Sequence, residues 1–237
     1  MLSHVRIVLI NTSHPGNIGA TARALKTMGL NRLYLVAPQQ FPHPKANEMA
    51  SGAADLLDQA VVVDTLEEAI SDCNLVLGTS VRERTIPWPM LTPRALAEKA
   101  IQNNNQEIAI LFGREQSGLT NEELHRCHFH VQIPSNPDYG SLNIAAAVQV
   151  IAYELRVASL GERVDEKAAW DYPYATALAL ENFYQHLEKV LIEIDFLNPA
   201  APRQLMARLR RLFHRAGLDE MEVNILRGVL KAVEKKI

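Results

Sequence analysis

Cysteine and long hydrophobic runs are the scarcest features of this sequence. Only Cys73 and Cys127 occur among its 237 residues, without CxxC spacing, which fits a reduced cytoplasmic protein better than a disulfide framework. No run approaches the roughly 18 apolar residues that a membrane helix needs. The apolar start is also too short for a signal peptide, so we expect Val5–Ile10 to form a first strand.

Motifs of several common enzyme classes are missing as well. There is no Walker loop, and Gly16-Asn-Ile-Gly19 lacks the GxGxxG spacing of a dinucleotide-binding loop. No HExxH motif is present, and the group His125, His128 and His130 is better explained as a solvated or packed cluster than as a metal site. No serine, histidine and aspartate arrangement comes with a nucleophile elbow. We therefore expect no metal site, Rossmann dinucleotide site or hydrolase triad.

The net charge of -3 hides an uneven distribution. Residues 202–237 contain nine Lys or Arg against four Asp or Glu, an excess of +5, so residues 1–201 carry -8. A solvated helix face would explain this excess, but a basic segment is also typical of a site for an anionic partner. The candidate RNA contacts in this segment are Arg208, Arg210, Arg211 and Arg215.

Short apolar runs alternate with helical patterns over residues 5–157. Strands are expected at 5–10, 33–36, 60–63, 75–80, 108–112 and 129–133, with helices between them. This alternation predicts an α/β fold: a parallel sheet with helices on both faces. Ligands of such sheets lie beyond the carboxyl ends of the strands. The polar, glycine-rich segments 11–19, 78–84, 113–118 and 134–143 all fall there.

The rest of the chain predicts a small all-helical extension. We place the α/β domain at 1–160, a linker at 161–174 and the extension at 175–237, with helices at 175–196, 203–216 and 219–236.

One stretch, Ile133 to Val150, joins the last predicted strand to a long helix. Its prolines, Asn136 and Gly140 make a stiff, bent loop, and Ser141 is the expected N-cap of a helix that begins near Asn143. On its own, this stretch is equally well explained as an ordinary strand-to-helix connection.

Three segments taken together resemble the motifs of the SPOUT methyltransferases, a family of knotted enzymes that use S-adenosylmethionine. These are Asn17-Ile-Gly-Ala-Thr-Ala-Arg23, Leu111-Phe-Gly-Arg-Glu-Gln-Ser-Gly-Leu-Thr120 and the stretch from Ile133. Within the family, the segments Arg84-Thr-Ile-Pro-Trp-Pro-Met and Ser141-Leu-Asn resemble those of one group of bacterial enzymes. These enzymes methylate the ribose 2′-hydroxyl at position 32 of the tRNA anticodon loop. The resemblance implies a C-terminal trefoil knot, a homodimer and metal-independent catalysis.

The resemblance also implies roles for individual residues. The expected cofactor-binding residues are Thr79, Ser80, Val81, Gly113, Ile133, Gly140, Ser141 and Leu142. Arg23 is expected to act at the ribose oxygen as a hydrogen-bond donor, because arginine is effectively always protonated. The other expected catalytic residues are Asn17, which positions the ribose; Glu115, which orients Arg23 or Asn17; and Ser141 and Asn143. Arg82 and Arg84, beside Trp88, are expected to meet the target nucleotide, although Trp88 equally suits a packing role.

Three alternatives remain open at this stage. The closest is a knotted 2′-O-methyltransferase with a different tRNA or ribosomal RNA target. The others are a non-catalytic RNA-binding protein on the same fold and an α/β nucleotide-binding enzyme such as a hydrolase. The four residues Asn17, Arg23, Glu115 and Ser141 argue for retained catalysis.

Overall fold

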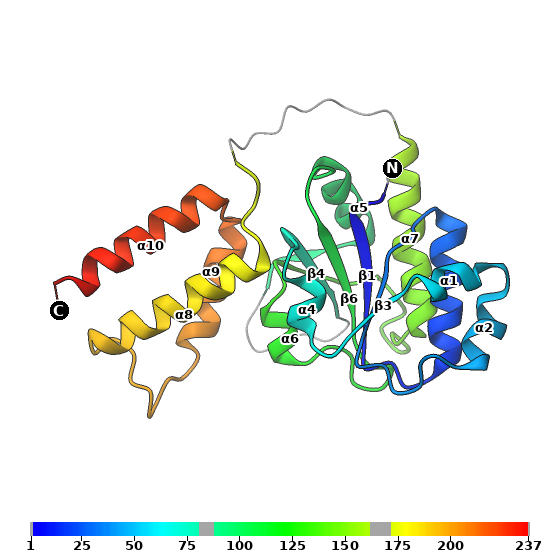
Figure 1. Ribbon diagram of the computed structural model, residues 1–237, viewed down its shortest axis with the longest axis horizontal. Helices are drawn as coiled ribbons and strands as arrows, with labels where there is room; N and C mark the ends of the chain where they lie inside the picture. The colour runs from blue at the N-terminus through cyan, green and yellow to red at the C-terminus, as the bar shows by residue number, and fades with distance from the viewer. Residues whose placement is uncertain (1, 81–87, 162–171, 237) are drawn as a thin grey trace.

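A seven-stranded parallel sheet forms the centre of the protein (Figure 1). The structure is a computed structural model that describes residues 2–80, 88–161 and 172–236. The strand order is β3-β2-β1-β6-β4-β7-β5. The strands are β1 (Val5–Ile10), β2 (Leu33–Val36), β3 (Val61–Val63), β4 (Leu75–Thr79), β5 (Met90–Leu91), β6 (Ile108–Phe112) and β7 (Phe129–Val131).

The predicted parallel sheet is confirmed, with one strand more than expected. All residues of β1 and β6 are buried, as their β-branched and apolar composition predicts for every position except the charged Arg6. Val5 pairs with Ile108 at the start of the register. Strand β5 is not among the strands expected from the sequence. Two residues are too few to show a sequence period, and their pairing with β7 is what makes them a strand.

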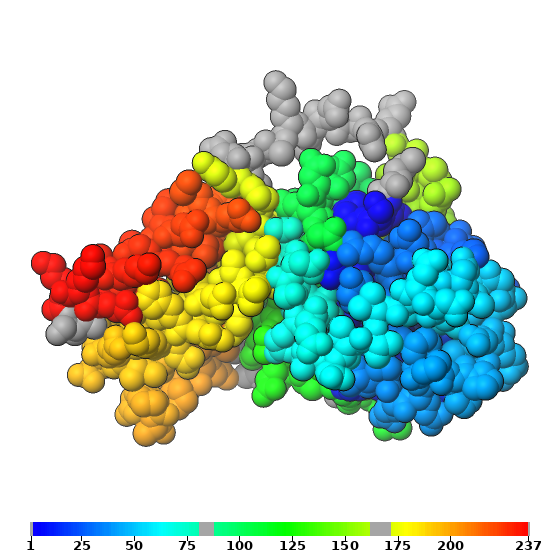
Figure 2. Space-filling view, viewed as in Figure 1, coloured from blue at the N-terminus to red at the C-terminus, as the bar shows by residue number. Residues whose placement is uncertain are grey.

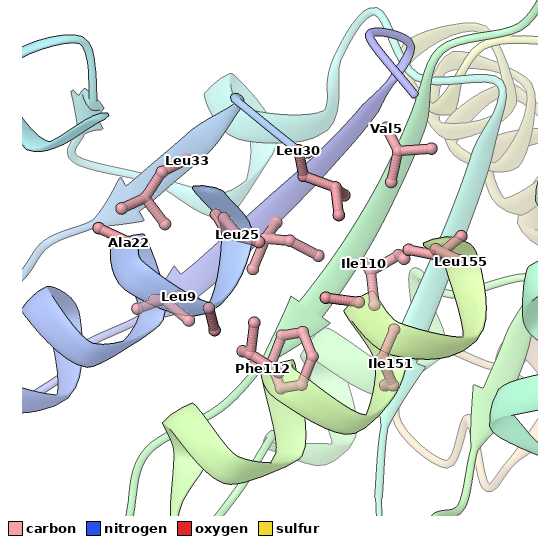
Figure 3. Packing of buried hydrophobic residues seen from close by; sticks show 14 of the residues in the cluster. Val5, Leu9, Ala22, Leu25, Leu30, Leu33, Ile110, Phe112, Ile151 and Leu155 are labelled. Carbon is pink, nitrogen blue, oxygen red and sulfur yellow. The ribbon is translucent and has the colours of Figure 1, made fainter. Parts of the chain in front are cut away.

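Helices cover both faces of the sheet. Side chains of α1 (Pro15–Met28), α5 (Pro93–Gln102) and α7 (Ile144–Leu160) pack with those of β1 and β6 on one face. Figure 3 shows this core, with Leu25 of α1 and Ile151 of α7 over the strands. The opposite face is covered by α4 (Leu66–Ile70) and α6 (Asn121–His125). The helices α2 (Pro44–Ala50) and α3 (Ala54–Asp58), joined by a short 3-10 turn, pack beside α1.

The start of α7 differs from the prediction. Asn143, not Ser141, is its N-cap: the Asn143 side-chain oxygen accepts a hydrogen bond from the backbone N–H of Ala145 at 2.9 Å. Both residue types cap helices well, so local preference could not choose between them. The choice leaves the Ser141 hydroxyl outside the helix.

Three C-terminal helices pack around a hydrophobic core of their own. Figure 2 shows this part of the chain, yellow to red, beside the blue-to-green part that contains the sheet. The three helices are α8 (Ala177–Glu193), α9 (Leu205–Ala216) and α10 (Glu220–Glu234), within two to three residues of the predicted helices at each end. Phe183 and Tyr184 of α8 are buried beneath α9 and α10. We call residues 172–236 the helical unit. In the described ranges, no helix is long and apolar enough to cross a membrane.

A cluster of aromatic and imidazole rings joins the helical unit to the sheet. Trp88 is 7% exposed, stacks on His125 and His130, and donates from its indole nitrogen to the Cys127 carbonyl at 2.9 Å. His214 of α9 contacts His128 edge to face, with 4.7 Å between ring centroids. Of the two roles that the sequence left open for Trp88, the structure therefore shows the packing role.

Acid is expected to weaken this junction. Burial lowers the pKa of His128 to about 4, and burial lowers the pKa of His214 as well, so both rings are neutral in the folded protein. Unfolded histidines bind protons below about pH 6.5, so stability is lost as the pH falls from about 6.5 towards 4. His128 alone should lower the free energy of unfolding at pH 5 by ~2 kcal/mol relative to neutral pH.

Urea unfolding at pH 7 and pH 5 measures this loss. The matched variant is His214→Phe, which keeps an aromatic ring at the junction but removes one titrating group. The free energy of unfolding of this variant should fall less between pH 7 and pH 5 than that of the wild type. An equal loss in both proteins would contradict the prediction.

Candidate active site

A cavity of about 470 Å³ opens at the carboxyl ends of three neighbouring strands, β6, β4 and β7. This is the edge of the sheet where ligands were expected. The walls come from the ends of β4 and β7, the loop after β6, and the segment that leads into α7. The lining residues are Thr79, Ser80, Phe112, Gly113, Arg114, Glu115, Gln116, Ser117, Gly118, Leu119, Val131, Ile133, Tyr139, Ser141, Leu142, Asn143, Ile144 and Ala147.

Most of the expected cofactor-binding residues meet at this cavity. Six of them line it: Thr79, Ser80, Gly113, Ile133, Ser141 and Leu142. Gly140 instead lines a neighbouring cavity of about 450 Å³, on the other side of the loop, together with Thr92 and Gln132. Val81 lies outside the described residues. Sequence reasoning missed several lining residues, of which Arg114 and the 82%-exposed Tyr139 are the most prominent; both stand inside the quoted motifs.

The loop after β6 folds back tightly on itself. The backbone N–H of Arg114 donates to the Gly118 carbonyl at 3.1 Å, and the Gly118 N–H donates to the Arg114 carbonyl at 2.8 Å. This closure presses Gly118 and Leu119 against Gly113, where an added Cβ would lie 2.1 Å from the Gly118 carbonyl carbon. Gly118 has a φ of 70°, a conformation that glycine adopts without strain. The cavity wall therefore depends on both glycines.

Two asparagines connect the three motif segments beside the cavity. The side-chain amide of Asn143 donates to the Asn17 oxygen at 2.9 Å, and the Asn17 amide donates to Glu115 Oε1 at 3.0 Å. Because the Asn143 oxygen already caps α7, its NH2 group is directed at Asn17. The helix cap, the start of α1 and the loop after β6 thus share one hydrogen-bond chain.

The Glu115 carboxylate accepts four hydrogen bonds. Besides Asn17, the donors are the backbone N–H groups of Ser13 and His14, each at 3.2 Å, and the Ser13 hydroxyl at 3.1 Å. Partial burial raises the pKa of this carboxyl, but the hydrogen bonds from Asn17 and the backbone outweigh it and hold the pKa below its usual range. Glu115 is therefore an ionised acceptor that orders the start of α1, and a weak proton acceptor.

Arg23 lies apart from this group. It is exposed on α1, six residues beyond Asn17, and it does not line the cavity. In the part of the chain that the structure describes, its guanidinium makes no ion pair or hydrogen bond, so the expected contact with Glu115 is not formed. Of the two partners that we expected for Glu115, the structure gives it only Asn17.

The arginines of α9 divide into two kinds. Arg208 and Arg215 are exposed, and Arg211 is half-buried. Arg210 instead forms a two-pronged ion pair with Glu181 of α8 at 2.7 and 2.9 Å, and its guanidinium lies 4.4 Å from the Tyr184 ring centre. These contacts give Arg210 a packing role within the helical unit. Arg82 and Arg84 lie outside the described residues.

Known proteins match the chain over both of its parts. The model of the SpoU rRNA Methylase family matches residues 4–153, and that of the tRNA methyltransferase TrmJ C-terminal domain matches residues 178–237. A tRNA (cytidine/uridine/adenosine-2′-O-)-methyltransferase TrmJ from Pseudomonas aeruginosa is 54% identical, over 99% of this chain and 95% of that protein.

Two solved structures also resemble it. The crystal structure of TrmJ from Z. mobilis is 35% identical and covers 97% of this chain and 98% of its own, with a TM-score of 0.84. The SpoU methyltransferase AviRb from Streptomyces viridochromogenes, in complex with AdoMet, has a TM-score of 0.51. It is 23% identical over 64% of this chain and 58% of its own, a likeness of fold alone.

Proposed function

Because the chain belongs to the SpoU methylase family, we propose that it methylates the ribose 2′-hydroxyl of tRNA, with S-adenosylmethionine as the methyl donor. The target is the cytidine or uridine at position 32 of the anticodon loop, as the sequence motifs imply. The single observation that carries the proposal is the Glu115–Asn17–Asn143 hydrogen-bond chain at the edge of the 470 Å³ cavity. It places polar groups for a sugar directly beside a pocket for a small molecule.

The cavity suits the proposed cofactor in size and chemistry. Its volume falls within the roughly 300–1,000 Å³ of small-molecule sites, and both polar and apolar side chains line it. Thr79, Ser80 and the Gly113–Gly118 loop would hold the cofactor, with Ile133 and Leu142 on its apolar parts. The bound cofactor supplies an electrophilic methyl group. On this proposal the three loops meet through a trefoil knot, as in the family.

The residues of the chain act on the hydroxyl side of the reaction. Asn17, Asn143 and Ser141 orient the ribose, and Glu115 keeps Asn17 in place. The 2′-oxygen gains negative charge as its proton leaves, and a fixed cation beside it lowers that cost. Arg23 is assigned this role because its guanidinium keeps its charge and has no partner among the described residues.

A homodimer would bring Arg23 to a cavity that it does not reach within its own chain. The outer face of α7 exposes an apolar stripe at helical spacing: Val150, Tyr153, Val157 and Leu160. We propose that a second copy covers this stripe and brings its own α1, which packs against its α7, to the cavity. We therefore assign Arg23 to the partner subunit's site.

One assay tests the proposed function. Labelled S-adenosylmethionine is incubated with total tRNA and the purified protein, with and without EDTA, and the methylated nucleotide is mapped. The expected product is 2′-O-methylated nucleotide 32, formed equally in EDTA because we assign no metal. Label at another tRNA position or in ribosomal RNA would favour the other knotted methyltransferases. No transfer to any RNA would refute the proposal. The buried free Cys73 and Cys127 are consistent with action in the cytoplasm.

The helical unit is expected to supply tRNA affinity through Arg208 and Arg215. Reversing both charges (Arg208→Glu with Arg215→Glu) should raise the Kd for tRNA about tenfold or more. The slope of log Kd against log salt concentration should fall by about two, because about two phosphate contacts are lost. Affinity for S-adenosylmethionine should not change. The matched control replaces both residues by lysine, which keeps the charge. Equal tRNA affinity of the glutamate and lysine variants would contradict the assignment.

A further inference from the structure

Arg114 connects three separate segments beside the cavity. It follows Gly113 at the end of β6 and lines the cavity. Its Nη1 donates to both carboxylate oxygens of Glu123 at 3.0 Å, and its Nη2 donates to the side-chain oxygen of Asn11. One guanidinium thus links the cavity loop, the start of α6 and the segment that leaves β1.

Both of its partners are themselves held firmly. Glu123 is 13% exposed and forms the capping box of α6 with Thr120. Asn11 has a φ of 49°, in the left-handed region, and its amide group donates to the Ala37 carbonyl at 3.2 Å. Asparagine adopts this conformation more readily than most non-glycine residues, and hydrogen bonds at both ends of its side chain fix it there.

Arg114 and Glu115 form hydrogen bonds to opposite ends of the segment that joins β1 to α1. Arg114 holds Asn11, where the chain leaves β1, while Glu115 holds Ser13, His14 and Asn17, where α1 begins. We infer that Arg114 is a positioning residue for methyl transfer: it fixes the segment 11–14 so that Asn17 meets Asn143 at the ribose site. This inference rests on the proposed function. Arg114 acts through Asn11 and Asn17 and touches no reacting atom.

The chemistry of the site calls for arginine in particular. The planar guanidinium can pair with a carboxylate through two N–H groups and still donate a third hydrogen bond in another direction. A lysine at position 114 would keep the positive charge next to Glu123. Its ammonium group would bridge the Glu123 carboxylate and the Asn11 side chain less well than a guanidinium does. Arg114→Lys should therefore keep part of the activity that Arg114→Gln loses.

The test compares Arg114→Gln and Arg114→Lys with Arg126→Gln. Arg126, the C-cap of α6, is a matched control, because like Arg114 it is 30% exposed and ion-paired, but its partners Glu67 and Glu181 do not line the cavity. For Arg114→Gln, kcat on tRNA should fall about 10- to 30-fold, since displacements below 1 Å at a reacting centre already cost much of the rate. The Kd for S-adenosylmethionine should stay within about threefold, because the backbone closure of the loop remains.

The other variants sharpen this result. Arg114→Lys should lie between Arg114→Gln and wild type in kcat, and Arg126→Gln should keep the wild-type kcat. Asn11→Gly removes the acceptor while permitting the positive φ, and it should reproduce the loss of kcat. Asn11→Asp keeps an acceptor for Arg114 and should lose less.

Amide hydrogen exchange over residues 11–17 supplies a readout that does not depend on the substrate. Exchange there should be faster in Arg114→Gln and unchanged in Arg126→Gln. Wild-type kcat and wild-type exchange in Arg114→Gln would overturn the inference, as would a loss of cofactor affinity that accounts for the whole loss of kcat. If the wild-type protein methylates no RNA, the proposed function fails, and the exchange measurement still decides whether Arg114 orders this segment.

Discussion

Arg23→Ala is expected to lower kcat for tRNA methylation by about 10²- to 10³-fold, the usual cost of removing one donor to a developing oxyanion. The Kd for S-adenosylmethionine should stay within about twofold, because Arg23 does not line the cavity. Single-turnover rates and calorimetric titration measure the two quantities. The control is Lys26→Ala, which removes a cation one turn further along α1 that already pairs with Asp55. A full-rate Arg23→Ala enzyme would remove this residue from the mechanism.

Mixed dimers test which subunit supplies Arg23. At a concentration of S-adenosylmethionine that fills the wild-type cavity but not the weakened Gly113→Ala cavity, the Arg23→Ala and Gly113→Ala chains are each expected to have little activity alone. If Arg23 serves the partner's cavity, a mixed dimer combines one intact cavity with one intact Arg23. Random mixing should then restore about a quarter of the wild-type activity. If Arg23 served its own chain, no site in the mixture would be complete and activity would stay low.

Gly113→Ala is expected to open the cavity wall. The added Cβ would lie 2.1 Å from the Gly118 carbonyl carbon and 2.2 Å from the Leu119 nitrogen, so the loop has to move. Overpacking of this kind costs about 1–3 kcal/mol, which predicts a loss of S-adenosylmethionine affinity of about 10- to 100-fold. Calorimetric titration measures the affinity, and thermal melting shows whether the fold survives.

The matched control for this variant is Gly52→Ala. A Cβ at Gly52 meets nothing within 4 Å, so cofactor affinity should not change. Wild-type affinity in Gly113→Ala would show that the cofactor binds away from this loop, and the proposed site would then be wrong.

The main strands and helices could be predicted because local sequence determines them. Val5–Ile10 and Ile108–Phe112 are apolar runs bounded by polar segments, and both form strands with the expected ends. Thr65, Thr92 and Thr120 cap their helices through their own side chains, within three residues. Strand β5 was missed because its pairing with β7 joins segments about 40 residues apart.

The site could be predicted only in part. The motif residues Thr79, Gly113 and Ser141 all line the cavity, which follows from the rule that ligands lie beyond the carboxyl ends of parallel strands. The sequence did not show that Arg210 pairs with Glu181, because Glu181 lies on another helix, 29 positions earlier. A basic helix face in the sequence does not show which of its charges are already paired inside the protein.

The sequence by itself determined the parallel α/β architecture, the glycine-rich loops at one edge of the sheet and the helices of the C-terminal unit, because periodicity and capping act over a few residues. Only the tertiary structure decided which polar groups meet. Asn17 and Asn143 are 126 positions apart, and Glu115 and Asn17 are 98 apart. Their contacts exist because β6 lies between β1 and β4 in the sheet, an order that no local pattern encodes. In the same packing, Asn143 and not Ser141 is the N-cap of α7, and Arg23 does not line the cavity of its own chain.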